Sequence, residues 1–244
     1  MGGGSPYFLK MSKMNVYHAI EMLLFHFPHL DAHQIEVERE LLRLHDQLRE
    51  DNSQLFAWAA TARPEFVDAT PPRKEACKAL TPGGKELHTV QIIWTNNLAF
   101  NLANRFLRTR DGDTLEAVEL AKRLEAFLTA NCLNFEEDVD QLIHQMSLLD
   151  TIGFIHMVAA THDPVLTTVV GGTACDVISK AMQYFVQAES HARKVFRHHE
   201  GAWSGSDWTA ADWKHEKVMF DNPFASQSLL EDHVRRAKAA ASKC

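Results

Sequence analysis

The sequence contains little cysteine, and its cysteines follow no known pattern. Four cysteines are spread over 244 residues, with no pair at the Cys-x-x-Cys spacing. Cysteine-based zinc sites need such pairs, and small disulfide-stabilised folds need a denser set, so the sequence favours neither. We therefore predict free thiols in a reducing, intracellular compartment. The cysteines are Cys77, Cys132, Cys175 and Cys244.

The chain also lacks an excess of basic residues. Its formal net charge is -7 at pH 7, from 25 Lys and Arg against 32 Asp and Glu. A protein that binds nucleic acid needs a basic surface to neutralise phosphates, so we expect no nucleic-acid partner. The first twenty residues contain Lys10 and Lys13 but neither acid nor arginine, which leaves a mitochondrial location open beside the cytoplasm.

No catalytic, nucleotide-binding or metal-binding motif is present in the sequence. It has no glycine-rich phosphate loop, no Gly-x-Ser-x-Gly and no His-Glu-x-x-His. Its 14 histidines form no ligand set, because Pro28 interrupts the run His26–His33. His45 and Asp46 form a His-Asp pair, but neighbours on a helix point about 100° apart. We predict no metal, no cofactor and no catalytic residue.

The segment Gln141–His162 is apolar on nearly every side of a helical wheel and carries one formal charge, Asp150. This pattern predicts a helix surrounded by protein. At about 1.5 Å per residue the segment could also cross a hydrocarbon core of about 30 Å. However, His144, His156 and Asp150 interrupt it, and an acid at mid-span costs about 2.5–3.5 kcal/mol. We predict a buried central helix and no transmembrane span.

Apolar residues elsewhere recur at the three- and four-residue spacing of helices, and no segment alternates convincingly as a strand. Capping residues and breakers set the ends of these helices, with Gly201 as the stop of the last long one. The fold class is all-α, an irregular multi-helix bundle of about seven to nine helices with an extended C-terminal tail. The predicted helices cover residues 15–27, 31–50, 55–63, 85–110, 114–130, 141–162, 173–200 and 226–242.

The composition predicts three parts. Residues 1–14 form a flexible N-terminal segment, and residues 15–201 form the helical domain, with a loose Pro/Gly-rich break near 64–84. Residues 202–244 form a Trp-rich tail and a terminal helix. We expect that this tail can be deleted without unfolding the helical domain.

Several polar residues are predicted to face the interior. Asp150 lies on the core side of its helix, so it must be paired, hydrogen-bonded or protonated. It is either a buried helix-to-helix contact or the acid of a site. Asn97, Asn101 and Asn104 share a face at i, i+4 and i+7, which favours hydrogen bonds to a neighbouring helix, with Asp150 one candidate partner. A polar ligand is the alternative. His45 is the remaining predicted buried polar residue.

Large aromatic residues gather in the tail without helical or strand period. Such residues on irregular backbone are typical of segments that lie across another surface. We predict that they contact a partner protein, with packing on the chain's own helices as the alternative. They are Trp203, Trp208, Trp213, Phe220 and Phe224.

These features predict a non-catalytic structural or interaction subunit of an intracellular multiprotein assembly, cytoplasmic or mitochondrial. Its expected partners are other protein subunits, and peripheral association with a membrane is left open. The alternative is a helical small-molecule-binding or hydrolytic enzyme, centred on Asp150 with His45 or His156 as the second titratable group.

Overall fold

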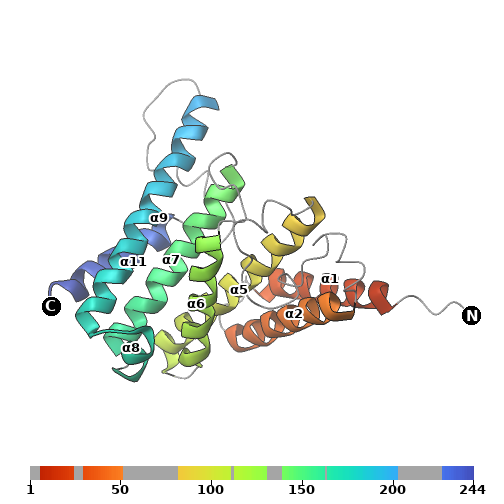
Figure 1. Ribbon diagram of the computed structural model, residues 1–244, viewed down its shortest axis with the longest axis horizontal. Helices are drawn as coiled ribbons and strands as arrows, with labels where there is room; N and C mark the ends of the chain where they lie inside the picture. Colours follow the sequence, from red (N-terminus) through yellow and green to blue (C-terminus); the bar gives the residue numbers. More distant parts are fainter. Residues whose placement is uncertain are drawn as a thin grey trace, which may run out of the picture. The chain divides into compact units, whose positions relative to one another are not determined.

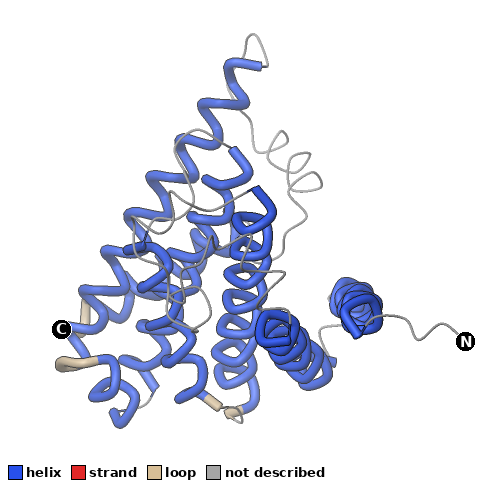
Figure 2. The backbone as a smooth tube through the Cα atoms, turned by 45° about the vertical axis from the view of Figure 1, so that its right-hand side comes forward, coloured by secondary structure: helices blue, strands red, loops and turns tan. Residues whose placement is uncertain are grey.

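The described part of the chain is almost entirely helical, as the computed structural model shows (Figures 1 and 2). This confirms the all-α class: eight helices and no strand occur in the described residues. The predicted helix over residues 55–63 lies outside the described residues. The described ranges are 6–24, 30–51, 82–110, 113–130, 139–162, 164–202 and 227–244.

The chain divides into a first unit, Met1–Leu133, and a second unit, Asn134–Cys244. In the first unit each helix packs on the next along the chain: α1 on α2, α2 on α5, and α5 on α6. These helices span Pro6–Leu24, Asp31–Asp51, Pro82–Thr109 and Thr114–Ala130. Most of the predicted Pro/Gly-rich break, residues 64–81, lies outside the described residues.

Helix α1 covers residues 6–14 of the segment predicted to be flexible, and residues 1–5 lie outside the described residues. The helix begins at Pro6, well before the predicted start at Asn15. Proline is well suited to the first position of a helix, because its fixed φ is already helical and its missing N–H would have no partner there. No further breaker follows before Leu24, so the helix continues unbroken.

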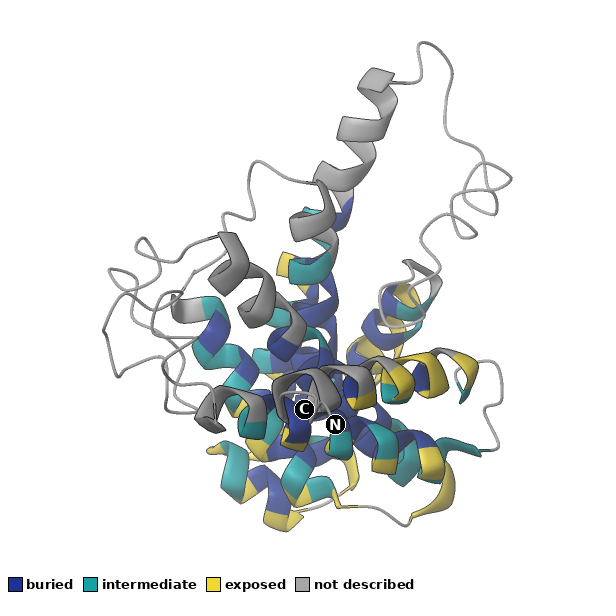
Figure 3. Ribbon diagram, turned by 90° about the vertical axis from the view of Figure 1, so that its right-hand side faces the viewer, coloured by how far each residue is buried: buried dark blue, intermediate teal, exposed yellow. Residues whose placement is uncertain are grey.

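The second unit is built around α7, Val139–His162, the predicted central helix. It packs mainly against α9, Ala174–Ala202, and the terminal helix α11, Gln227–Ala241, packs on both. From Met146 to Ala159 every residue of α7 is buried. Figure 3 marks the buried residues of the described helices in dark blue. The predicted tail is therefore not separable as a whole, because its terminal helix packs within the second unit.

Two local features differ from the expected helix ends. The β-branched segment after the central helix forms a short helix, α8 (Pro164–Val170), because Pro164 starts it and Thr167 Oγ1 donates a hydrogen bond to the Ala159 carbonyl at 2.9 Å. Gly201 lies inside α9 rather than ending it, since the helix runs one residue further. Glycine is unfavourable inside a helix, but the assigned last residue of a helix varies by one or two positions, so the difference is small.

Gly153 allows α9 to approach α7 closely. A Cβ atom at this position would lie 2.8 Å from Phe185 Cε1, and the Phe185 side chain is fully buried. The contact is below the van der Waals distance, and a packed ring has no free space to move into. Gly153 is therefore the point where the aromatic side chain of α9 rests on the backbone of α7.

We expect Gly153→Ala to destabilise the second unit by about 1 kcal/mol. The clash should cost about 1–3 kcal/mol, and the better helix propensity of alanine returns up to about 1 kcal/mol of it. Thermal unfolding followed by circular dichroism would measure the change. In a Phe185→Leu background, Gly153→Ala should destabilise the second unit less. Equal destabilisation in the wild-type and Phe185→Leu proteins would contradict this packing.

No single helix in the described residues is long and apolar enough to cross a membrane. One bent pair, α8 with residues 174–192 of α9, passes the test of length and composition, with an angle of 61° between its parts.

Candidate functional site

The second unit contains a buried pair of titratable side chains, Asp150 on α7 and His233 on α11. His233 Nδ1 donates to the Asp150 carboxylate oxygens at 2.9 and 3.0 Å. The two residues are 3 % and 2 % exposed. Asp150 therefore faces the core and is paired there, with a partner 83 residues further along the chain.

Aromatic rings enclose the imidazole of His233. The Phe154 ring, one turn after Asp150, stacks on it at 4.2 Å between centroids and 19° between planes. Phe185 from α9 lies 6.1 Å away at 38°. The pair thus has apolar walls from α7 and α9, while α11 supplies the histidine. The contact of Gly153 with Phe185 holds one of these walls in place.

Burial raises the pKa of Asp150 above its ordinary value, and the hydrogen bond and charge of His233 oppose this rise. A carboxylate that orients a histidine through Nδ1 is an arrangement that general-base sites use. Here, however, both side chains are enclosed, so a substrate would meet the pair only if α11 moved. In the second unit, the Asp150–His233 pair therefore joins α11 to α7.

Of the two histidines expected beside Asp150, His156 makes its contacts with Ile152 and Tyr184, and His45 belongs to the first unit. His156 Nδ1 donates to the Ile152 carbonyl at 2.8 Å and its ring faces Tyr184, 5.4 Å between centroids. His45 is buried in the first unit, edge-on to the Trp94 ring at 6.2 Å. His233 was missed, although Leu230, Val234 and Ala237 mark the face of α11 to which it belongs. All three of these are buried.

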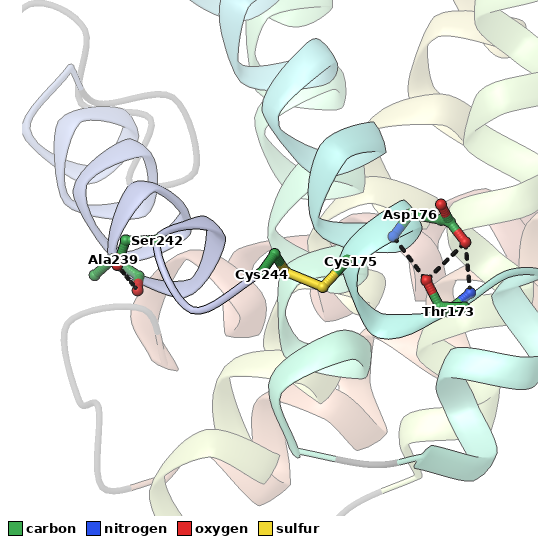
Figure 4. Close-up of a disulfide and its surroundings, with 6 residues drawn as sticks. All are labelled: Thr173, Cys175, Asp176, Ala239, Ser242 and Cys244. Carbon is green, nitrogen blue, oxygen red and sulfur yellow. Dashed lines mark hydrogen bonds between the residues drawn. A yellow bond between two sulfur atoms is a disulfide. The ribbon is translucent and has the colours of Figure 1, made fainter.

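A disulfide joins Cys175, at the start of α9, to Cys244, just after α11 (Figure 4). The Cα atoms are 5.6 Å apart and the residues are 69 positions apart in sequence. The prediction of four free thiols is therefore wrong for these two residues, and Cys77 and Cys132 lie outside the described residues. Sequence spacing could not show the bond, because only the fold brings these ends together. The cysteine argument for a reducing compartment falls with it.

The first unit holds a row of buried polar contacts between helices. Asn97 Nδ2 donates to Glu21 Oε1 on α1 at 3.1 Å, and Asn101 Nδ2 donates to Glu38 Oε1 on α2 at 2.6 Å. Asn97 and Asn101 thus bond neighbouring helices of the first unit, whereas Asp150 belongs to the second unit and pairs with His233 there. Asn104, at the end of the row, is only partly buried.

The apolar stripe of α1 faces outward. Val16, Ile20 and Leu23 are 58 %, 37 % and 63 % exposed, whereas Glu21 on the opposite side is 4 % exposed. Glu21 accepts hydrogen bonds from Asn97 and from His18, and Lys13 Nζ donates to Glu40 on α2 at 3.0 Å. These polar contacts hold the Glu21 side of α1 inward, and Val16, Ile20 and Leu23 remain exposed.

The predicted aromatic contacts of the tail lie outside the described residues: Trp203, Trp208, Trp213, Phe220 and Phe224. Within the described ranges, no group of three or more His, Cys, Asp or Glu side chains is arranged to hold a metal ion.

Comparison with protein-family models, curated proteins and solved structures found no match for this chain.

Proposed function

We propose that this chain is a non-catalytic, protein-binding subunit of a multiprotein assembly, and that a partner protein contacts the exposed stripe of α1. The stripe consists of Val16, Ile20 and Leu23, and its exposure is the observation that carries the proposal. These positions follow at i, i+4 and i+7, the spacing by which an amphipathic helix presents one face to a partner.

The stripe is costly to leave in water. Fully burying a Val, Leu or Ile side chain contributes about 1.5–3 kcal/mol, so three large exposed side chains in one line offer a partner a substantial gain. Exposed apolar side chains that occur singly are ordinary, but a contiguous patch is typical of interaction sites. The buried contacts of Glu21 support the same view, because they hold the helix with this side outward.

The intracellular location, cytoplasmic or mitochondrial, stays a prediction. The disulfide favours an oxidising compartment over the reducing cytosol. The predicted contacts of the tail aromatics with a partner also remain a proposal.

The test is affinity purification of the tagged full chain from its native source, with mass spectrometry of the proteins retained. We expect Ile20→Glu together with Leu23→Glu to reduce recovery of the partner at least about tenfold, because charges at the centre of an apolar contact are strongly unfavourable. Val186→Glu is the matched control, since Val186 is 58 % exposed on α9 of the second unit. An unchanged set of retained proteins in the α1 variant would refute the proposal.

A second candidate, a helical enzyme or small-molecule-binding protein, is favoured by one observation: His233 lies within hydrogen-bonding distance of Asp150. The 3 % and 2 % exposure of the two residues supports the structural role instead. A ligand that binds there should protect Asp150 from a carboxyl-modifying carbodiimide, whereas a purely structural pair should resist the reagent without any ligand.

A further inference from the structure

We propose that the Cys175–Cys244 disulfide is a redox latch, which holds α11 against α7 and α9 and which a dithiol reductant opens to expose Asp150. The bond ties the start of α9 to the residues that follow α11: Cys175 is the second residue of α9, and Cys244 lies three residues beyond α11 (Figure 4). Both residues are exposed, so a reductant reaches the sulfur atoms without any unfolding.

Apart from the disulfide, α11 is held through one face of the helix. Its inward face consists of Leu230, His233, Val234 and Ala237, at i, i+3, i+4 and i+7, and its outward face is charged. A 15-residue helix is marginal by itself in water, so α11 depends on these contacts and on the covalent tether. Cutting the tether removes the constraint that keeps a detached α11 beside its site.

Release of α11 has a defined local consequence. His233 on α11 is the partner of Asp150 and stacks on Phe154. When α11 detaches, the imidazole is therefore removed from both residues. Asp150, which is 3 % exposed under α11, would then face solvent beside the Phe154 and Phe185 rings. The reduced protein therefore presents an apolar surface with one carboxyl group, which the oxidised protein covers.

The chemistry is ordinary thiol–disulfide exchange. One thiolate of the dithiol attacks Cys244 Sγ, the S–S bond breaks, and Cys175 leaves as a thiolate. The second thiolate of the reductant then frees Cys244 and closes the reductant's own disulfide. Two electrons pass to the protein, and its two cysteines take up the two protons that the dithiol loses.

Hydrogen exchange of the full chain, read by mass spectrometry of peptides, tests the latch with dithiothreitol as the reductant. In air-oxidised protein the α11 amides should be protected, and dithiothreitol should speed their exchange at least about tenfold while residues 146–159 of α7 remain protected. Asp150 should become reactive to a carbodiimide and an added amine under the same conditions. Cys175→Ser should show fast α11 exchange with or without the reductant.

A Cys77→Ser/Cys132→Ser variant is the control, and it should keep the full response to dithiothreitol. Three results would overturn the proposal. One is a peptide map of the oxidised protein without the Cys175–Cys244 link, and another is equal α11 exchange in oxidised and reduced protein. The third is a response to reductant that persists in Cys175→Ser.

Discussion

Replacement of Asp150 by leucine is expected to lower the free energy of unfolding of the second unit by about 3–5 kcal/mol, because it removes one partner of a buried pair and leaves the other enclosed. His233 Nδ1 would lose the carboxylate that accepts its hydrogen bond, while the residue stays 2 % exposed and stacked on Phe154. Urea unfolding of the oxidised protein, followed by circular dichroism, would measure the loss.

Two further variants separate the pair from simple packing. Asp150→Asn keeps an oxygen that accepts the His233 hydrogen bond, so it should cost only about 1–2 kcal/mol. Asp150→Leu combined with His233→Phe removes both polar groups, and it should recover much of the loss seen for Asp150→Leu alone. If leucine and asparagine at position 150 are equally tolerated, the pair contributes little to stability.

Features set by neighbouring residues were predictable from the sequence. Asp31 starts α2 and its carboxylate contacts the Ala32 amide at 2.9 Å, while Thr173 and Asp176 cap each other at the start of α9. The burial of α7 followed from its apolar residues alone, which occupy nearly every side of the helical wheel. In each case the signal lies within a few turns of the helix that it describes.

Features set by pairing of distant residues were not predictable. The partner of Asp150 is 83 residues away and that of Cys175 is 69 away, so no local period indicates either. The outward face of α1 was not predictable for a related reason. Apolar residues at helical spacing usually face the interior, but here hydrogen bonds from Asn97 and His18 hold Glu21 inward instead. Only knowledge of α5 would have shown this.

The first unit should become less stable as the pH rises above about 4.5, because of Glu38. Burial, and next the nearby charge of Glu21, raise the pKa of Glu38 well above its ordinary value, against the opposing hydrogen bonds of Asn101 and Gln34. Between its pKa in the unfolded chain and this raised pKa, the folded state binds more protons. The contribution of Glu38 to the free energy of unfolding is thus fully present below the unfolded pKa and is lost as the pH rises through the folded one.

Glu38→Gln should remove this dependence and stabilise the first unit at neutral pH by about 1–3 kcal/mol, because a neutral amide is less costly to bury than a carboxylate. The glutamine oxygen can still accept from Asn101 and Gln34, as Glu38 Oε1 does at 2.6 and 3.3 Å. Its amide nitrogen replaces Oε2, a buried atom with no hydrogen-bond partner in the described residues. Urea unfolding between pH 4 and pH 8 would measure the gain and its pH dependence.

Glu40 provides the control, since it lies two residues away on the same helix but is partly exposed. Hydrogen bonds from Arg43, and then from Lys13, lower its pKa to about 2. Its contribution is therefore present above its unfolded pKa and is lost as the pH falls towards 2, the reverse of Glu38. Glu40→Gln should slightly weaken the first unit at neutral pH, whereas Glu38→Gln should strengthen it. If both variants destabilise the unit at pH 8, the Glu38 carboxylate is stabilised in its charged form by groups beyond Asn101 and Gln34.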